Sequence, residues 1–352
     1  MTYRKYYFKR IAKRVFCSIL FYLGITNLII ILLKKLDKGK HCVLILLYHR
    51  FSHHSKAPHL LPYMHVEDFR RHMSYIRKWY EIISLDELID NLNDNKKFTT
   101  PRIILTFDDG YKSNYTLAYP ILRNLNLPAT IFLTSGLIGS EKGLWVDELE
   151  NILLYTPVKK FALPEIFKDE VLSVNTLKQK REIKDRLRSH LLYADNNTRR
   201  KYINKLRKIL KLENDTIKMA KDRIMLNWEE IREMAAHNIT FGGHTLSHPA
   251  LTCIPFPEAA NEIIESKNQI ERHLGLSVRH FAVPNGEDND FNESLSQFCK
   301  EIGFKSIASA NHGLIDNTNK DPYWLKRISA SPSLPVFAFD LLRYLFLSHS
   351  SP

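Results

Sequence analysis

Two adjacent acidic residues, Asp108 and Asp109, stand where the chain could carry out metal-assisted chemistry. They follow Ile103–Phe107, an apolar run that predicts a buried strand, within the motif TFDDGY that ends at Tyr111. The carboxyl ends of such strands are where α/β sheets and barrels place their sites. Neighbouring carboxylates repel each other unless a positive partner, such as a metal ion on one of them, separates their roles. The structural alternative is a turn in which the pair caps a helix, because Asp-Gly is common in turns.

A second motif, His244-Thr245-Leu246-Ser247-His248, contains two potential metal ligands. Histidines four residues apart can converge on one ion if the chain between them is helical or tightly turned. Thr245 stands where the general-base Glu of a metalloprotease would be, so a base must come from elsewhere. An HxxxH motif alone is unspecific. Two histidines and one aspartate, however, make the three-ligand pattern of a catalytic zinc site, and the second aspartate supplies the base.

Three other classes of site fit the sequence poorly. A phosphatase of the haloacid-dehalogenase type needs an Asp where Phe107 stands. A non-haem iron oxygenase shares the ligand set, but the alternation of strands and helices is the wrong setting for it. An EF-hand needs alternating acidic positions, and the motif does not have them.

The two motifs together resemble those of the NodB-homology polysaccharide deacetylases, also called carbohydrate esterase family 4. Their TFDDG motif is matched by Thr106–Gly110 and their H[ST]xxH motif by His244–His248. Tyr48-His49-Arg50 is similar to the YHxV-like end of their first strand, and Trp228–Ala236 (WEEIREMAA) is also similar to the family. The resemblance covers roughly residues 42–136 and 226–330.

The resemblance implies a role for each motif residue. Asp109, His244 and His248 would bind a divalent metal, with Zn²⁺ as the expected ion, and Asp108 would be the general base. The backbone amide of Tyr111 would stabilise the oxyanion of the tetrahedral intermediate.

The third motif of the family is only partly present, in Phe281-Ala282-Val283-Pro284-Asn285-Gly286. Pro284 and Gly286 are kept, but Ala282 replaces the Arg that would orient the base, as in a branch of the family with FAYPxG. Arg327 is the candidate to replace that charge. We place Tyr111, His49, Pro284, Gly286 and Arg327 on the substrate side of the site. His49 is also the better candidate for the general acid, although it could equally be a hydrogen-bonded residue at the rim of a barrel.

The order of apolar runs and helical segments predicts an α/β fold with parallel strands. We expect a distorted, incomplete (β/α) barrel over residues 41–345, interrupted by a helical insertion at 138–226. The insertion is charged, has no strand candidates, and contains two helices joined near Asn196–Asn197. The four cysteines are far apart and indicate neither a zinc ribbon nor a disulfide framework.

The net charge of +13 is concentrated in two segments. Residues 1–40 hold ten Lys/Arg and one acid, and residues 158–225 hold nineteen Lys/Arg and nine acids. The remainder is mildly acidic. A membrane surface explains the first segment better than nucleic acid does, and we expect no nucleic-acid partner. The second segment is either a solvated helical face or a contact for anionic lipid or glycan.

The N-terminal segment, residues 1–40, is predicted to associate with a membrane. Val15–Leu33 is uncharged and basic residues flank it on both sides. It could be a single-pass anchor, a helix in the membrane plane, or a helix docked on the protein itself. The more basic N-terminal flank would place the catalytic domain outside the cytoplasm.

The predicted function is therefore removal of N-acetyl groups from amino sugars of a polysaccharide or a lipid-linked glycan. Two alternatives remain at this stage. One is removal of a formyl or other acyl group from a lipid-linked sugar. The other is a membrane-associated protein that binds a glycan without catalysis.

Overall fold

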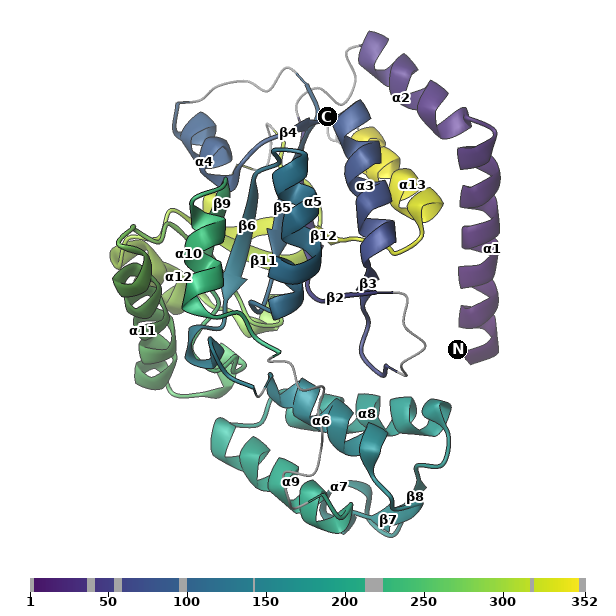
Figure 1. The fold of residues 1–352 in the computed structure, drawn as a ribbon, viewed down its shortest axis with the longest axis vertical. Helices are drawn as coiled ribbons and strands as arrows, with labels where there is room; N and C mark the ends of the chain where they lie inside the picture. Colours follow the sequence, from purple (N-terminus) through teal and green to yellow (C-terminus); the bar gives the residue numbers. More distant parts are fainter. Residues whose placement is uncertain are drawn as a thin grey trace.

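A closed ring of seven parallel strands forms the centre of the computed structural model (Figure 1). The structure describes residues 3–36, 42–53, 59–94, 100–141, 143–212, 224–316 and 320–347. The strands, in chain order, are β1 (Val43–Tyr48), β5 (Arg102–Phe107), β6 (Ala129–Leu133), β9 (Ile239–Gly243), β10 (His280–Ala282), β11 (Ser306–His312) and β12 (Leu325–Ser329).

The ring closes because β1 pairs with β5 on one side and with β12 on the other. The spatial order is β1-β12-β11-β10-β9-β6-β5, and a short strand, β4 (Glu81–Ile82), adds to the outer side of β5. Pairing of β1 with β5 runs in register from Val43 and Arg102 to Tyr48 and Phe107. The predicted α/β barrel is thereby confirmed, with seven strands.

The strands are apolar on both faces because one face lines the barrel and the other packs against helices. Val43, Ile45 and Ile104 belong to an inner cluster, whereas Leu44 and Leu105 belong to the larger core beneath the surrounding helices. The period of two along a strand therefore decides which side chains enter the barrel. On β5 the inward series continues from Ile104 through Thr106 to Asp108.

Helices α3 (Val66–Trp79), α4 (Leu85–Asn93), α5 (Tyr119–Asn124), α10 (Trp228–Ala235), α11 (Phe256–Leu274) and α12 (Glu293–Glu301) surround the barrel. Ser84 caps α4, since its side chain accepts a hydrogen bond from the Glu87 amide. A π-helical turn, η1 (Asn114–Ala118), leads into α5.

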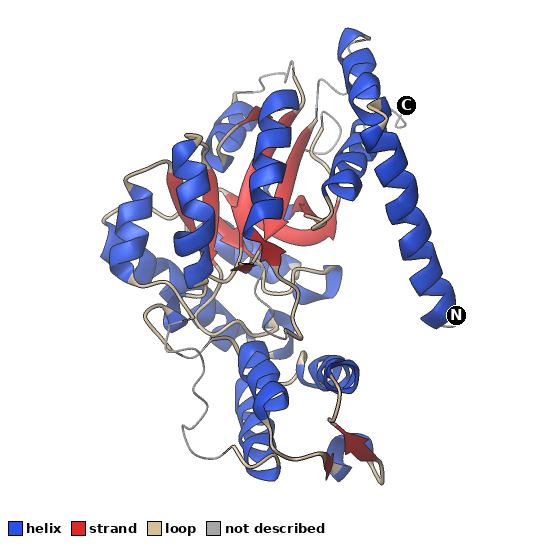
Figure 2. Cartoon of the chain, turned by 45° about the vertical axis from the view of Figure 1, so that its right-hand side comes forward, coloured by secondary structure: helices blue, strands red, loops and turns tan. Residues whose placement is uncertain are grey.

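The insertion lies at the carboxyl end of the barrel strands and has its own apolar core (Figures 1 and 2). It comprises α6 (Trp145–Tyr155), α7 (Pro164–Phe167), α8 (Leu177–Leu191) and α9 (Asn196–Ile209). The expectation of an insertion without strands is wrong, because β7 (Lys160–Ala162) and β8 (Val171–Ser173) form an antiparallel hairpin. Only Phe161 and Leu172 are buried in these strands, so the apolar alternation is too short to stand out among the charged neighbours.

The apolar N-terminal segment forms two helices, α1 (Tyr3–Tyr22) and α2 (Ile25–Lys35). They meet at a bend of 68°, next to Gly24 with its left-handed φ of 73°. In the described part of the chain, neither this pair nor any other segment provides one straight helix long and apolar enough to cross a membrane. The pair reaches that length and composition only when its two bent halves are taken together.

One side of α1 packs on the last helix, α13 (Leu334–Leu347). Lys13 forms a 2.8 Å ion pair with Asp340, and the rings of Phe16 and Phe339 are 5.8 Å apart. Cys17 is buried in this contact. The helix is thus docked on the domain along one side.

Candidate metal centre

Asp109, His244 and His248 lie close together at the carboxyl end of the barrel, although 135 positions separate the first from the second in the sequence. Their ligand atoms all fall within 4.8 Å of one another. Each histidine Nε2 is 3.5 Å from the same oxygen, Oδ1 of Asp109. That oxygen is buried and has no hydrogen-bond partner among the described residues. Two atoms that each sit about 2.0–2.2 Å from a tetrahedral metal are themselves separated by roughly 3.4 Å, so the three side chains fit a shared divalent ion.

Both histidines direct Nε2 toward Asp109 in this centre. His244 Nδ1 is 2.7 Å from the carbonyl oxygen of Ala282, to which it can donate, and this leaves Nε2 facing Asp109. Metal-binding histidines are commonly oriented by such a bond. Burial, followed by the nearby charge of His244, lowers the pKa of His248 to about 4, so this imidazole is neutral at pH 7.

A tight turn brings His248 beside His244. Thr245 and His248 have φ values of 66° and 61°, in the left-handed region that is unfavourable for such residues. The Thr245 hydroxyl accepts a 3.0 Å bond from the His248 amide. From α11, the Glu262 carboxylate accepts bonds from the amides of Leu246 and Ser247 and from the Ser247 hydroxyl. The turn is therefore held from outside by a buried carboxylate.

The two neighbouring aspartates have different partners. Asp108 continues the inward series of β5 and forms two parallel hydrogen bonds with Arg327, of 2.7 and 2.8 Å. Asp109 has a φ of 76°, which turns the chain out of the strand and directs its carboxylate to the histidines. Both are almost fully buried. Burial is the largest single influence and would raise the pKa of Asp108. The charges of Arg327, His244 and His49, with the hydrogen bonds from Arg327, together lower that pKa below its usual value.

Arg327, on β12, is completely buried inside the barrel. Its Nε donates to the Ser309 carbonyl at 2.6 Å, and its Nη1 reaches the Thr106 hydroxyl at 3.4 Å. The cation expected from sequence to replace the missing Arg at Ala282 thus lies beside the predicted base. It acts through Asp108, because the residues that line the cavity include Asp108 but not Arg327.

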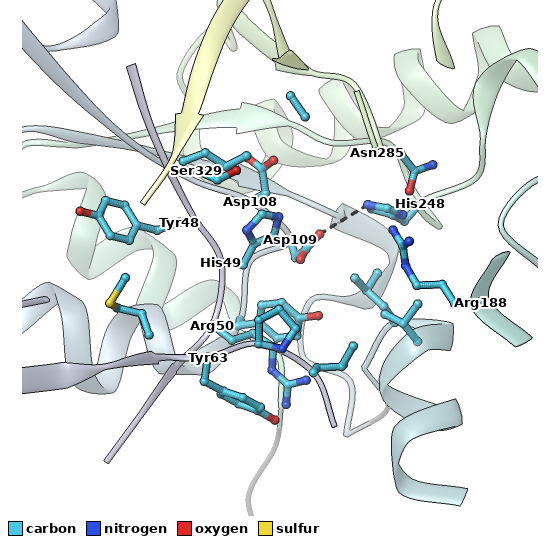
Figure 3. A pocket seen from close by; sticks show the side chains of 18 of the residues that line it. Tyr48, His49, Arg50, Tyr63, Asp108, Asp109, Arg188, His248, Asn285 and Ser329 are labelled. Carbon is cyan, nitrogen blue, oxygen red and sulfur yellow. Dashed lines mark ion pairs between the residues drawn. The ribbon is translucent and has the colours of Figure 1, made fainter. Parts of the chain in front are cut away.

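The other predicted substrate-side residues fall at the same end of the barrel. His49 is exposed at the end of β1 and lines the cavity, and its imidazole is near enough to contribute to lowering the pKa of Asp108 and Asp109. Tyr111 is buried in the cavity wall. Pro284 and Gly286 flank Asn285, which lines the cavity (Figure 3). Gly286 has a φ of 72°, and a Cβ there would lie 2.6 Å from the Ala310 nitrogen.

A cavity of about 580 Å³ opens above the three ligand side chains. Barrel residues form one side of it, and helices α6 and α8 of the insertion form another. The insertion residues in this wall are Leu144, Trp145, Val146, Lys184, Asp185, Arg188 and Leu192. The insertion is therefore part of the candidate site.

A buried ionic cluster joins the insertion to the barrel beneath this cavity. Arg50 donates to Asp147 of α6 at 2.6 Å, and its guanidinium carbon lies 4.4 Å from the centre of the Tyr63 ring (Figure 3) and 4.8 Å from that of Tyr111. Burial raises the pKa of Asp147 to about 6, while the Arg50 charge opposes that rise. Glu150 accepts hydrogen bonds from the backbone amides of Leu60 and Leu61, in the segment between β1 and α3.

Several of these residues were not predicted from the sequence. Arg50 belongs to the Tyr48-His49-Arg50 motif. Its partners Asp147 and Glu150 lie in the insertion, where the sequence does not distinguish them from solvent-exposed acidic residues of a helix. Glu262 and Arg188 also sit in amphipathic helices among other charged residues. Their spacing carries no signal, because only tertiary packing directs them to the site.

The family model described as "Polysaccharide deacetylase" matches residues 95–172 and 195–307, more than half of the chain. The chain belongs to the polysaccharide deacetylase family. Among curated proteins it is similar to "Putative polysaccharide deacetylase YxkH" of Bacillus subtilis (strain 168), with 31% identity over 87 residues. That match covers 24% of this chain and 31% of the relative, so the chain spans about a third of the length of that protein.

Solved deacetylase structures share the fold of this family member. The Streptococcus pyogenes deacetylase PplD, solved in complex with acetate, aligns with a TM-score of 0.56 and 18% identity, covering 86% of this chain and 98% of that one. IcaB from Ammonifex degensii aligns with a TM-score of 0.55 and 17% identity, covering 85% and 97%. At these identities the likeness concerns the fold.

Substitutions should separate the base from the ligands. Asp108→Asn should leave bound metal unchanged while turnover falls by about 10²–10⁴-fold, because a proton acceptor is lost and not a ligand. His248→Ala should lower the metal content itself. Metal analysis of the purified variants, with thermal unfolding as a control for folding, measures both. Loss of metal from a stable Asp108→Asn variant would mean that the two carboxylates have the opposite roles.

Arg327 should act as a positioning residue. In Arg327→Gln, kcat should fall by at least about 10-fold with a nearly unchanged KM, because the base is no longer held by two bonds. Arg327→Lys keeps the charge and should recover part of kcat, although not the paired geometry. If the Gln variant does not fold, since an unpaired buried charge costs about 3–5 kcal/mol, the Lys variant still gives the test. An Arg327→Lys enzyme with wild-type kcat and stability would refute the role.

Proposed function

We propose that this protein is a metal-dependent deacetylase that hydrolyses N-acetyl groups on amino sugars of a glycan. The observation that carries the proposal is the division of roles between Asp108 and Asp109. One aspartate is held by an arginine and the other faces two histidines, at the floor of a cavity. Family membership supports the same reaction class, hydrolysis of a carbon–nitrogen bond other than a peptide bond.

Asp109, His244 and His248 would hold a divalent ion, with Zn²⁺ suited to this mixed nitrogen and oxygen set. Such an ion polarises an amide carbonyl and lowers the pKa of a water bound to it. The described geometry supports this assignment through the buried, unpartnered Oδ1 of Asp109.

Side chains of the protein would carry out the proton transfers. Asp108 is ionised and oriented by Arg327, so it can accept a proton from the attacking water. His49, exposed at the cavity and near both carboxylates, is placed to return a proton to the departing amine. The Tyr111 amide, just after the Asp-Asp-Gly turn, is the proposed donor to the oxyanion.

This arrangement favours catalysis over simple glycan binding. Burying the Asp108–Arg327 pair costs desolvation energy that a metal site alone would not require. The buried pair is expected in an enzyme, because catalysis requires an ionised carboxylate beside the attacking water. We therefore favour the enzyme over the non-catalytic alternative.

The activity test is release of a free amine by the metal-loaded full chain. We expect turnover of N-acetylglucosamine oligomers or of a polyprenyl-linked N-acetyl amino sugar, loss of turnover with a chelator, and recovery on adding Zn²⁺. Matching N-formyl substrates identify the acyl group. The Asp108→Asn variant is the matched control. A folded, metal-loaded wild type that acts on none of these substrates would contradict the proposal.

We also propose that the N-terminal helices attach the enzyme to a membrane surface. The side of α1 and α2 turned away from α13 exposes a row of apolar side chains, of which Val15 and Ile19 are each 53% accessible. The others are Ile11, Tyr22, Leu23, Leu28, Ile31, Leu32 and Leu36. Exposed lysines and Arg14 flank this row at both ends. An apolar face with flanking cations suits a helix pair lying in the plane of an anionic bilayer.

We propose that the two basic segments, residues 1–40 and 158–225, face the same membrane, and helix α1 is oriented accordingly. It runs beside the barrel with its start toward the end that carries the insertion (Figures 1 and 2). Contact of the insertion with the same membrane, and placement of the domain outside the cytoplasm, remain predictions of the sequence.

Membrane attachment can be tested by flotation with vesicles containing anionic lipid. A Val15→Asp/Ile19→Asp variant should lose most vesicle binding, because two charges would enter the apolar interface. Leu276→Asp, at an apolar residue 59% exposed elsewhere, is the control and should bind like wild type. A wild-type chain that ignores vesicles and instead forms a dimer through this face, seen by sedimentation, would overturn the proposal.

A further inference from the structure

Among the charged residues that line the cavity, Arg188 of α8 differs in having no ionic partner. Arg50 is paired with Asp147, Lys184 with Asp185, and Asp108 with Arg327. The described residues give Arg188 neither an ion pair nor a hydrogen bond. Burial raises the pKa of Asp290, and the charge of Arg188 partly opposes this rise. An exposed guanidinium thus remains available at the cavity wall.

Arg188 extends from the insertion toward the side of the cavity where His248 and Asn285 lie (Figure 3). Its helix is held in place at several points. Lys184, one turn earlier, donates to the Leu60 carbonyl at 2.9 Å, and Asn196, after the helix, donates to Ser247 of the histidine turn at 2.9 Å. The cation is therefore carried by a fixed element.

The turn after α8 is itself locked by an arginine. Arg199 donates to the carbonyls of Leu191, Leu192 and Ala194, and its guanidinium lies 4.9 Å from the centre of the Trp145 ring. Arg199 is buried and donates to Asn196 at 3.2 Å, the residue that bonds Ser247 of the histidine turn. The insertion thus adds two cations, Arg188 and Arg199, on the histidine side of the site. Of these two, Arg188 is the one that a substrate can reach.

An N-acetylated sugar is neutral and does not require such a cation. We infer that Arg188 binds an anionic group, a phosphate or a carboxylate, carried by the glycan next to the sugar that is deacetylated. Guanidinium groups bind both anions through paired hydrogen bonds. This inference rests on the proposed deacetylase function and specifies its substrate class as an acidic glycan.

Kinetics with matched substrates test the inference. The full-length, metal-loaded chain is assayed on an N-acetylglucosamine tetramer, on the same tetramer with a terminal phosphate, and on an oligomer alternating N-acetylglucosamine with glucuronic acid. Wild type should prefer at least one acidic oligomer, and the preferred one distinguishes phosphate from carboxylate. Arg188→Gln should raise KM for that oligomer by about 10-fold or more, with kcat and the neutral oligomer little affected.

Two further variants serve as comparisons. Arg188→Lys should show an intermediate KM and a stronger dependence on salt, because a single ammonium lacks the paired contacts. Arg200→Gln removes an exposed charge from α9, away from the cavity lining, and should behave like wild type. Equal effects of Arg188→Gln on neutral and acidic oligomers would overturn the inference. So would unchanged kinetics with a lower melting temperature, which would mean that Arg188 only compensates Asp290.

A binding measurement keeps this test independent of turnover. The Asp108→Asn variant, with and without Arg188→Gln, is titrated calorimetrically with N-acetylglucosamine 1-phosphate and with N-acetylglucosamine. The phosphate should strengthen binding only when Arg188 is present. If no oligomer is turned over but this difference is seen, the deacetylase proposal fails while the anion site stands. If turnover is normal and the difference is absent, the anion site fails alone.

Discussion

Two ionised carboxylates on neighbouring residues can be buried together only if each has its own positive or metal-binding partner. In this chain the alternation of β5 directs Asp108 into the barrel, where Arg327 meets it with two hydrogen bonds. The left-handed φ of Asp109 turns the next side chain toward His244 and His248. Without that change of backbone direction the two charges could not be separated. The chemistry of the site depends on this division.

The closed barrel supplies the partners because all of its parallel strands end at one rim. His244 follows β9, Asp109 follows β5, and Arg327 lies on β12, so residues far apart in sequence meet without long loops. Strained and fixed turns complete the geometry. Glu262 holds the histidine turn, and Ala282, which lacks the family's arginine, still contributes its carbonyl to orient His244. A cation on another strand, Arg327 of β12, thus lies beside Asp108, while the carbonyl at Ala282 contacts His244.

The insertion forms part of the site and is not an appendage. A buried cluster around Arg50 and Asp147 fixes its first helix to the end of β1, and Asn196 ties its last helix to the histidine turn. The wall that it adds contains both aromatic and cationic side chains. In this chain the candidate ligands follow the barrel strands, while an inserted segment lines the cavity above them.

The sequence by itself determined the barrel and singled out the residues of the two central motifs. Buried parallel strands are continuous apolar runs, and the candidate metal ligands lie in short local motifs at the ends of such runs. Arg327 could be proposed because a charge was missing at Ala282. The hairpin β7–β8, the break at Gly24 and the partners of Arg50 could not be predicted in this way. A strand with one buried residue leaves no periodic pattern in the sequence. The same holds for a bend in a helix pair that docks on α13 and for ion pairs between residues far apart in the chain. Only the tertiary structure decided them, because burial and pairing of these side chains arise from segments that meet after folding.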